Sequence, residues 1–432
     1  MESSTRRKRI KDVRRKNAKL YPIYKMFSWD LLCYYSIEYL FLTITKGVSI
    51  SDVLLLSAFY LISKMLVQIP SVTICDFLGR KRSIVLGNAM LVGYMFTLIV
   101  APSMPLMLFS MFLCAFGYAI KNLSETNLLY DSVATKGGDG LYSRLDSKGG
   151  SLYYVFDGIA SLVAGYLFIV NNYLPVLICL LCLIIATILS CGFSDVYDLR
   201  QKKGKDKSLL TTFKEYGSDL KDTCKFIFNS SRMKALILFR VVFYSLIKII
   251  DIYRSDLLVD IGIPEEQFSM IFAVLTFIAA IAVSARETLE RKYKNRILTF
   301  ISLSYVFSVI SVGTISCITT SKSILPIILI MYVIAKVCSA IWFVLEGKYV
   351  KNFTNERVRS KITFTYELIG CMAAAIASVL AGQLVKVVTI EQAFLLVGLI
   401  GLIAIVLTLD YMRTRFGLKP KEYAKKDIEF SK

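Results

Sequence analysis

"IASLVAGYLF", residues 159–168, is repeated with few changes as "IASVLAGQLV", residues 376–385, about half a chain later. Each copy has a serine and a glycine four residues apart, a spacing at which small side chains share one helix face and let a second helix approach closely. Other positions repeat in the same order at a similar distance: Trp29 with Phe239, and Glu125 with Glu346. This order predicts a chain built from two similar halves.

The composition places these halves in a membrane. The chain has 432 residues, 56% of them hydrophobic, and a mean hydropathy of +0.59, above the apolar share of about 45–50% in soluble domains. Apolar runs of roughly 20 residues recur, each long enough to cross a hydrocarbon layer of about 30 Å as a helix. We therefore predict an all-α integral membrane protein with twelve transmembrane helices in two pseudo-symmetric six-helix bundles. The predicted spans are 21–45, 51–74, 83–101, 105–128, 150–171, 173–192, 233–255, 265–284, 297–318, 325–345, 362–386 and 391–413.

The distribution of Lys and Arg orients the helices and divides the chain. If twelve helices alternate, the basic segments fall on one side, which the positive-inside bias assigns to the cytoplasm. Both termini are then cytoplasmic, and we expect the protein in the cell membrane. The predicted parts are a basic cytoplasmic arm at 1–20, a first bundle at 21–192, a cytoplasmic linker at 193–232, a second bundle at 233–414 and a cytoplasmic tail at 415–432.

The net charge of +20 follows mostly from this topology. The basic residues are dispersed among short loops, which favours contact with anionic membrane lipids over nucleic acid. The chain has ten cysteines and no histidine, so a metal site with histidine ligands is excluded. We predict no cofactor and no metal, and we expect a monomer. The sequence contains no phosphate-binding G-x-x-x-x-G-K-[ST] loop and no H-E-x-x-H motif, so we predict neither an ATP-driven pump nor an enzyme.

The turn between the second and third spans reads "DFLGRKR", residues 76–82. An acid at a helix end, a glycine that permits a tight reversal and a basic cluster can dock onto neighbouring helix ends. The turn resembles the signature of the major facilitator superfamily, in which Gly, three residues and Asp precede two residues, Gly, Arg and then Lys or Arg. Asp76, Gly79, Arg80 and Lys81 match this pattern, whereas Val72 stands where the first glycine would be.

The resemblance implies a secondary transporter that works by alternating access, with the substrate held between the halves. In several members of the family, the arginine of this turn closes a cytoplasmic gate with an acid at the end of the fourth span. Here that acid would be Asp131 in "LLYDS". The corresponding turn of the second half, "ERKYKNR" at 290–296, has Tyr293 in place of the glycine and departs from the pattern.

Charged residues inside the spans are the candidate site residues, because such residues are costly in a membrane and tend to face partners or cavities. Asp30 and Glu38 of the first span align with Arg240 and Lys248 of the seventh, with the same separation of eight residues. This alignment predicts acids on one half facing bases on the other. Lys336, midway along the tenth span, is a further candidate for the cavity wall.

Three uses of these charges remain open. Protonation of Asp30 or Glu38 would couple transport to protons, the charges would bind a charged or zwitterionic solute, or they would link the bundles statically. Our first hypothesis is proton-coupled export of a small organic solute, because some drug/proton antiporters of the family have acids in the first span. The alternatives are uptake of a nutrient by proton symport and a membrane sensor or assembly partner that transports nothing.

Overall fold

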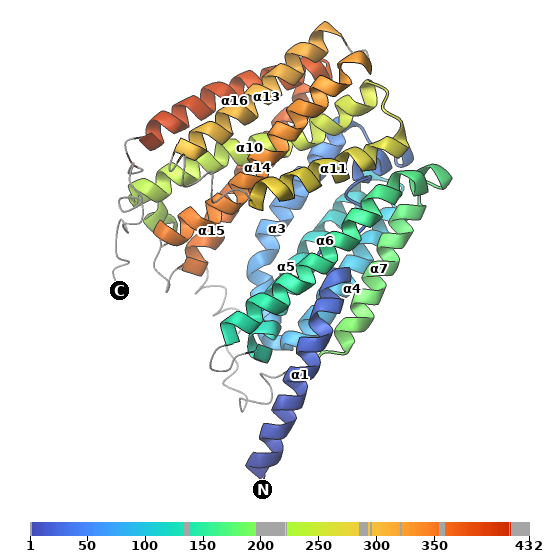
Figure 1. The fold of residues 1–432 in the computed structure, drawn as a ribbon, viewed down its shortest axis with the longest axis vertical. Coiled ribbons are helices and arrows are strands. Elements are labelled where there is room, and N and C mark those ends of the chain that lie inside the picture. The colour runs from blue at the N-terminus through green and yellow to red at the C-terminus, as the bar shows by residue number, and fades with distance from the viewer. Residues whose placement is uncertain are drawn as a thin grey trace. The chain divides into compact units, whose positions relative to one another are not determined.

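The computed structural model describes residues 2–133, 138–195, 221, 223–284, 293, 296–319, 322–353, 359–413 and 415. Figure 1 shows that the described chain forms long helices joined by short connections. The helices of the first half are α1 (Glu2–Ser28), α2 (Glu38–Leu40), the π-helix η1 (Phe41–Thr45), α3 (Ile50–Leu78), α4 (Arg80–Val100), α5 (Met104–Val133), α6 (Gly138–Val170) and α7 (Leu174–Cys191). Those of the second half are α10 (Ser231–Asp260), α11 (Glu265–Ser284), α13 (Arg296–Ile318), the 3-10 turn η2 (Lys322–Ile324), α14 (Leu325–Phe353), α15 (Arg359–Leu384) and α16 (Ile390–Arg413).

Eleven of the twelve predicted spans each fall on one helix and the first falls on an interrupted helix, which confirms the all-α membrane fold. Within the described residues, nine helices are long and apolar enough to cross a membrane by length and composition. The other three predicted spans correspond to α1 with α2 and η1, to α10 and to α11. The first of these differs from the prediction, since the helix begins at Glu2 inside the predicted arm and is interrupted within the membrane segment.

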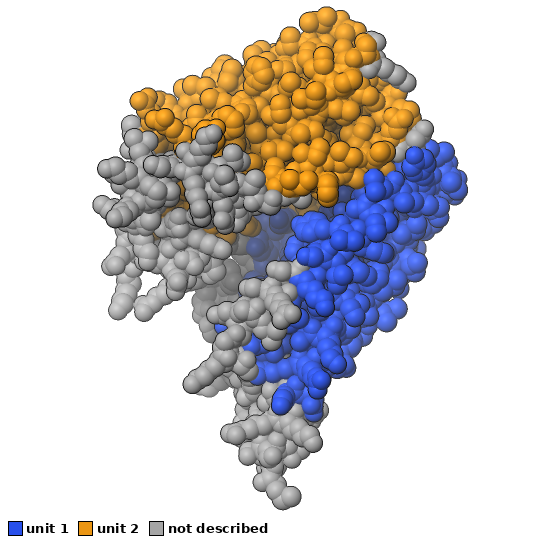
Figure 2. Space-filling view, viewed as in Figure 1, with its two compact units in different colours: residues 1–46, 62–215 blue, residues 47–61, 216–432 orange. Residues whose placement is uncertain are grey.

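The chain divides into two compact units, coloured separately in Figure 2. Unit 1 comprises residues 1–46 and 62–215, and unit 2 comprises residues 47–61 and 216–432. The first part of α3 thus groups with the second unit. Most of the predicted linker and nearly all of the predicted tail lie outside the described residues.

The two units repeat one pattern of helix neighbours. In unit 1, α4 packs against α5 and α7, and α1 packs against α5, α6 and α7. In unit 2, α13 packs against α14 and α16, and α10 packs against α14, α15 and α16. These pairs correspond one to one under the sequence repeat. Small residues permit the closest approaches, since a Cβ atom on Gly87 of α4 would lie 2.8 Å from the backbone oxygen of Gly117 of α5.

The second copy of the repeated ten-mer marks one of these packing faces. A Cβ atom on Gly382 of α15 would lie 3.2 Å from the backbone oxygen of Ser51, at the start of α3. Further along the same face, a buried cluster joins α3, α10 and α15 through Ala58, Leu61, Tyr244, Cys371, Ala374 and Ala375. Gly382 of the second copy therefore serves close helix packing, as its spacing from Ser378 predicts.

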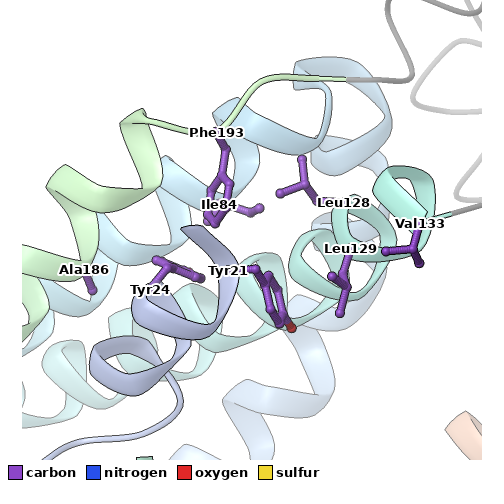
Figure 3. Close-up of a cluster of buried hydrophobic side chains, with 8 residues drawn as sticks. All are labelled: Tyr21, Tyr24, Ile84, Leu128, Leu129, Val133, Ala186 and Phe193. Carbon is purple, nitrogen blue, oxygen red and sulfur yellow. The ribbon is translucent and has the colours of Figure 1, made fainter. Parts of the chain in front are cut away.

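In unit 1, a second buried cluster fixes the end of α1 against α4, α5 and α7 (Figure 3). Its members are Tyr21, Tyr24, Ile84, Leu128, Leu129, Val133, Ala186 and Phe193. The rings of Tyr24 and Phe193 meet edge to face, with centroids 5.0 Å apart, an arrangement that aromatic pairs favour. This packing places the hydroxyl of Tyr24 beside the buried charges of α5.

Candidate functional site

The first predicted span is a broken helix. α1 ends at Ser28, residues 29–37 are not helical, and Cys33 has a φ of 63°, in the left-handed region. This corrects the expectation of one helix over 21–45. Non-helical backbone at membrane depth frees polar groups that must find partners within the protein.

Lys121 of α5 satisfies the carbonyl groups at the end of α1. Its ammonium donates to the backbone oxygen of Ser28 and lies 3.5 Å from that of Trp29. A cation at this position also complements the negative end of the helix dipole. The side chain of Lys121 is fully buried. The broken helix is therefore tied to α5 by one charged group.

Asp30 is the second residue of the break. Its Oδ1 atom accepts hydrogen bonds from the backbone N–H of Leu31, at 3.0 Å, and from the hydroxyl of Tyr118. The Lys121 ammonium interacts favourably with the same carboxylate. Asp30 itself is only half-buried. The carboxylate is thus held by α5 and by its own backbone while part of the residue stays exposed.

Glu125 extends this cluster on α5. Its Oε1 atom lies 3.9 Å from the Lys121 ammonium and accepts hydrogen bonds from the hydroxyls of Tyr24 and Ser28. Asn88 of α4 in turn donates to the Tyr24 oxygen at 2.9 Å. Lys121 and Glu125 are four residues apart on α5, the spacing of a local ion pair. In the structure this pair connects α1, α4 and α5. The sequence signal for this cluster was a charged pair deep in an apolar span.

Two further carboxylates belong to the same unit. Glu38 begins α2 and is half-buried, and it interacts electrostatically with Tyr34 and Tyr94. Asp157 of α6 is half-buried and repels Asp30 electrostatically. Asp30, Glu38 and Asp157 are thus three acids in or beside the break.

Arg240 of α10 has its partner inside unit 2. Its Nη1 atom donates to Oε1 of Glu346 on α14, and both side chains are buried. The guanidinium carbon also lies 4.9 Å and 4.8 Å from the ring centres of Tyr244 and Tyr366. Gly370 of α15 makes room, since a Cβ atom there would lie 2.2 Å from the Arg240 Nε atom.

The predicted pairing of Arg240 with an acid of the first span stays a prediction, and within unit 2 the partner of Arg240 is Glu346. Glu346 occupies the repeat position of Glu125, so each unit holds one buried carboxylate at the same place. In unit 1 its partners come from α1 and α5, and in unit 2 from α10. The sequence repeat aligns these two glutamates, but it does not identify Arg240 as the partner of Glu346.

Lys248 and Lys336, the other predicted site residues, come together in unit 2. Both are half-buried, and both interact electrostatically with Asp251 of α10. Asp251 forms an ion pair with Arg254, with Oδ1 and Nη2 3.1 Å apart. Neither Asp251 nor Arg254 was a predicted site residue. Asp251 lies one turn after Lys248 on α10, and Arg254 lies one turn after Asp251.

The predicted gate residues meet at the start of α4. The Arg80 Nε atom lies 4.0 Å from Oδ2 of Asp131, with the side chains 20% and 23% exposed. Gly79 has a φ of 80°, a conformation that glycine adopts without the usual steric cost. The N–H of Lys81 donates to Asp195, 2.9 Å away, an acid that the sequence reading missed.

Some predictions about these turns lie beyond what the structure describes. Asp76 falls in the last turn of α3, and its side chain is not described. Of the second-half turn at 290–296, only Tyr293 and Arg296 are among the described residues. In the first half the structure thus shows one ion pair between predicted gate residues, and the gate role itself stays a prediction.

Long apolar helices in two units with the same neighbours, a helix interrupted within its predicted span and buried charges beside the interruption are features of secondary transporters. The family model described as Major Facilitator Superfamily matches residues 26–316. The chain belongs to this family.

Similar proteins agree with this assignment. An uncharacterised MFS-type transporter of Bacillus subtilis (strain 168), YxaM, is 22% identical over 369 residues, covering 84% of this chain and 88% of the relative. The crystal structure of the nucleoside transporter NupG superposes with a TM-score of 0.71 at 8% identity, covering 93% of this chain and 99% of that one. A POT family transporter in complex with 5-aminolevulinic acid gives a TM-score of 0.66 at 13% identity, covering 94% and 96%. At these identities the solved structures show the fold alone.

Proposed function

We propose that this secondary transporter exports a small organic solute in exchange for protons, with Asp30 as the group that binds and releases the proton. The observation that carries the proposal is the position of Asp30 in the break between α1 and α2, half-buried and hydrogen-bonded to Tyr118. An ionisable group within a membrane helix is expensive to keep and is a functional candidate for that reason.

The contacts of Asp30 give protonation a structural consequence. As a carboxylate it accepts from the N–H of Leu31 and from Tyr118, and it attracts Lys121. A proton on Asp30 removes this attraction and weakens both hydrogen bonds. Since Lys121 also holds the carbonyl of Ser28, the protonation state of Asp30 acts on the same ammonium that fixes the end of α1. We therefore place the coupling between proton and conformation at this break.

In this proposal Arg240 has a structural role within unit 2, whereas its sequence position predicts that it faces an acid of the first span. Its guanidinium group forms an ion pair with Glu346 and lies over the rings of Tyr244 and Tyr366. We assign it to holding α10, α14 and α15 together. Glu38 remains a second candidate for proton binding, since it is half-buried at the start of α2.

The turn before α4 is proposed as a cytoplasmic gate. Arg80 and Asp131 lie within ion-pair distance at one end of α4 and α5. A partly exposed pair of this kind contributes about 0.2–1 kcal/mol, a size suited to a contact that must break and re-form in each transport cycle. The gate residues are then Gly79, Arg80, Lys81 and Asp131, with Asp76 of the same turn.

Export is proposed as the direction because some drug/proton antiporters of the family have acids in the first span. The test uses proteoliposomes loaded with a metabolite mixture and placed in an acidic external buffer, with mass spectrometry of the external medium. Accelerated loss of a particular solute from the lumen, together with lumenal acidification, is expected. A solute that instead accumulates in the lumen when supplied outside would show proton symport. Solute flux that ignores the pH gradient would contradict proton coupling altogether.

A further inference from the structure

Unit 2 contains a group of hydrogen-bond donors in which the basic side chains outnumber the acidic ones. Lys248, Asp251 and Arg254 follow one another at intervals of three residues on α10 and so lie along one face of the helix. On α14, Tyr332 and Lys336 are four residues apart and share a face in the same way.

Aromatic contacts bring these two faces together. The guanidinium carbon of Arg254 lies 5.9 Å from the ring centre of Tyr332 and 4.7 Å from that of Phe272 on α11. The ammonium of Lys248 lies 5.7 Å from the ring centre of Tyr244, one turn earlier on α10. Lys336, one turn along α14 from Tyr332, interacts electrostatically with both Asp251 and Lys248.

The charges of this group do not cancel. Asp251 is paired with Arg254 at 3.1 Å, and it is the one carboxylate among the described residues that acts on Lys336. Within the described chain, neither lysine ammonium forms a hydrogen bond or an ion pair. One acid therefore faces three basic side chains, which leaves an excess of about two positive charges.

Buried donors without acceptors add to this excess. The Nε atom of Arg254 and the hydroxyl of Tyr332 are buried and have no hydrogen-bond partner among the described residues. Buried polar groups in folded proteins nearly always have partners. Ammonium and guanidinium groups have donors only, and a tyrosine hydroxyl can donate as well. An oxyanion supplies the acceptors and the charge that this group lacks.

The depth of the lysines argues against a simple contact with lipid headgroups. Lys336 lies eleven residues from the start of α14, about 16 Å along a helix, whereas half of a hydrocarbon layer is about 15 Å. Lys248 is deeper in α10, seventeen residues from its start and twelve from its end. Both side chains are half-buried rather than exposed.

We infer that Lys248 and Lys336 form the anion-binding part of the substrate site, so that the transported solute is a small organic anion with a carboxylate or phosphate group. The inference rests on the proposed transport function, and it adds the class of solute. Arg254 and Tyr332 complete the set of donors around the anion, and the rings of Tyr244 and Phe272 offer apolar contact to its carbon skeleton.

The test is direct binding to the full-length protein in nanodiscs made of zwitterionic phosphatidylcholine. The probes are succinate, benzoate and inorganic phosphate, with succinamide as the neutral analogue, measured by calorimetry and by thermal stabilisation. We expect at least one anion to bind and succinamide not to bind. Lys248→Met and Lys336→Met should each weaken anion binding by about tenfold or more.

Controls separate binding from folding and from the proton step. Lys386→Met removes an exposed lysine at the end of α15 and should leave binding unchanged, and Lys336→Arg, which keeps the charge, should retain most of it. Anion binding is measured without a pH gradient and does not require proton coupling, so that failure of the proposed proton step and failure of this inference are distinguishable. If the protein bound none of the three anionic probes, the inference would be overturned. Loss of binding when phosphatidylglycerol is added to the nanodiscs would also overturn it, because the lysines would then hold a lipid headgroup.

Discussion

The ammonium of Lys121 on α5 donates to the backbone oxygen of Ser28, the last residue of α1. This contact joins the interrupted first span to the fourth and lies next to both Glu125 and Asp30. The break is thus stabilised by a charge from another helix rather than by a proline or glycine of its own. The end of α1 therefore depends on this one charged group for its partner.

Lys121→Met is expected to lower the free energy of unfolding by about 3 kcal/mol, because it leaves Glu125 without its cation and the Ser28 carbonyl without a donor. Labelling of the buried cysteines, such as Cys75 and Cys114, by a thiol-reactive dye during heating would report the loss. Lys64→Met, at an exposed position of α3, is the matched control. Equal stability of the two variants would show that the Lys121 contact does not hold the break.

Gly370→Ala is expected to destabilise unit 2 by roughly 1–3 kcal/mol, because the added methyl group collides with the Arg240 side chain and displaces it from Glu346. Gly347→Ala is the control, since a Cβ atom there meets nothing within 4 Å among the described atoms. Thermal unfolding of the two variants in the same detergent compares them directly. A loss as large in the control would refute the steric explanation.

Arg80→Ala is expected to favour cytoplasm-open states. Cys75, one turn before Gly79, is fully buried and accepts a hydrogen bond from Ser124 at 3.0 Å. Loss of the Arg80–Asp131 pair should raise labelling of Cys75 by a membrane-impermeant thiol reagent roughly two- to fivefold, in keeping with the energy of a partly exposed pair.

The reversed pair provides the control for the gate. Arg80→Asp combined with Asp131→Arg should return Cys75 labelling toward the original level, whereas either charge change alone should not. Labelling is followed by mass spectrometry of the peptide that contains Cys75. Unchanged labelling in Arg80→Ala would remove the turn from the gate.

Asp260, at the end of α10 and beyond the predicted span, introduces a pH dependence. Burial and the neighbouring carboxylates of Asp256 and Glu391 raise the pKa of Asp260 from 3.8 to about 6. The folded protein therefore binds more protons than the unfolded chain between these values, so this group lowers stability as the pH rises through that interval.

Asp260→Asn should accordingly raise the unfolding temperature above pH 6 and have little effect near pH 4. Thermal unfolding of the variant and the parent at both pH values measures the difference. Because Asp260 is exposed, solvent screening keeps the effect small. A stabilisation that is the same at both pH values would show that the charge of Asp260 is not its cause.

The twelve spans and the family were predictable because both depend on patterns within the sequence. Apolar runs set the spans, and the turn at Gly79 requires residues at fixed spacing. The contact of Arg80 with Asp131 followed from the family resemblance, and the structure brings these two residues within 4.0 Å.

The broken first span was not predictable from residues 29–37, which contain neither proline nor glycine. Hydropathy predicts a continuous helix over this stretch. The charge that caps the end of α1 belongs to Lys121, which is 93 residues from Ser28 in the sequence. The partner of Arg240 was missed for a related reason. Alignment of the halves predicts a pairing with Asp30, whereas the pair of Arg240 with Glu346 depends on how α10 and α14 pack within unit 2.

The most direct test of the account compares pH-driven flux with equilibrium exchange of the same solute in proteoliposomes containing the parent protein or Asp30→Asn, with Asp52→Asn as a control acid at the start of α3. We expect Asp30→Asn to abolish the flux that a pH gradient drives and to retain a substantial part of the exchange without a gradient. We expect Asp52→Asn to retain both. Full pH-driven flux in Asp30→Asn would contradict the assignment of the proton to Asp30.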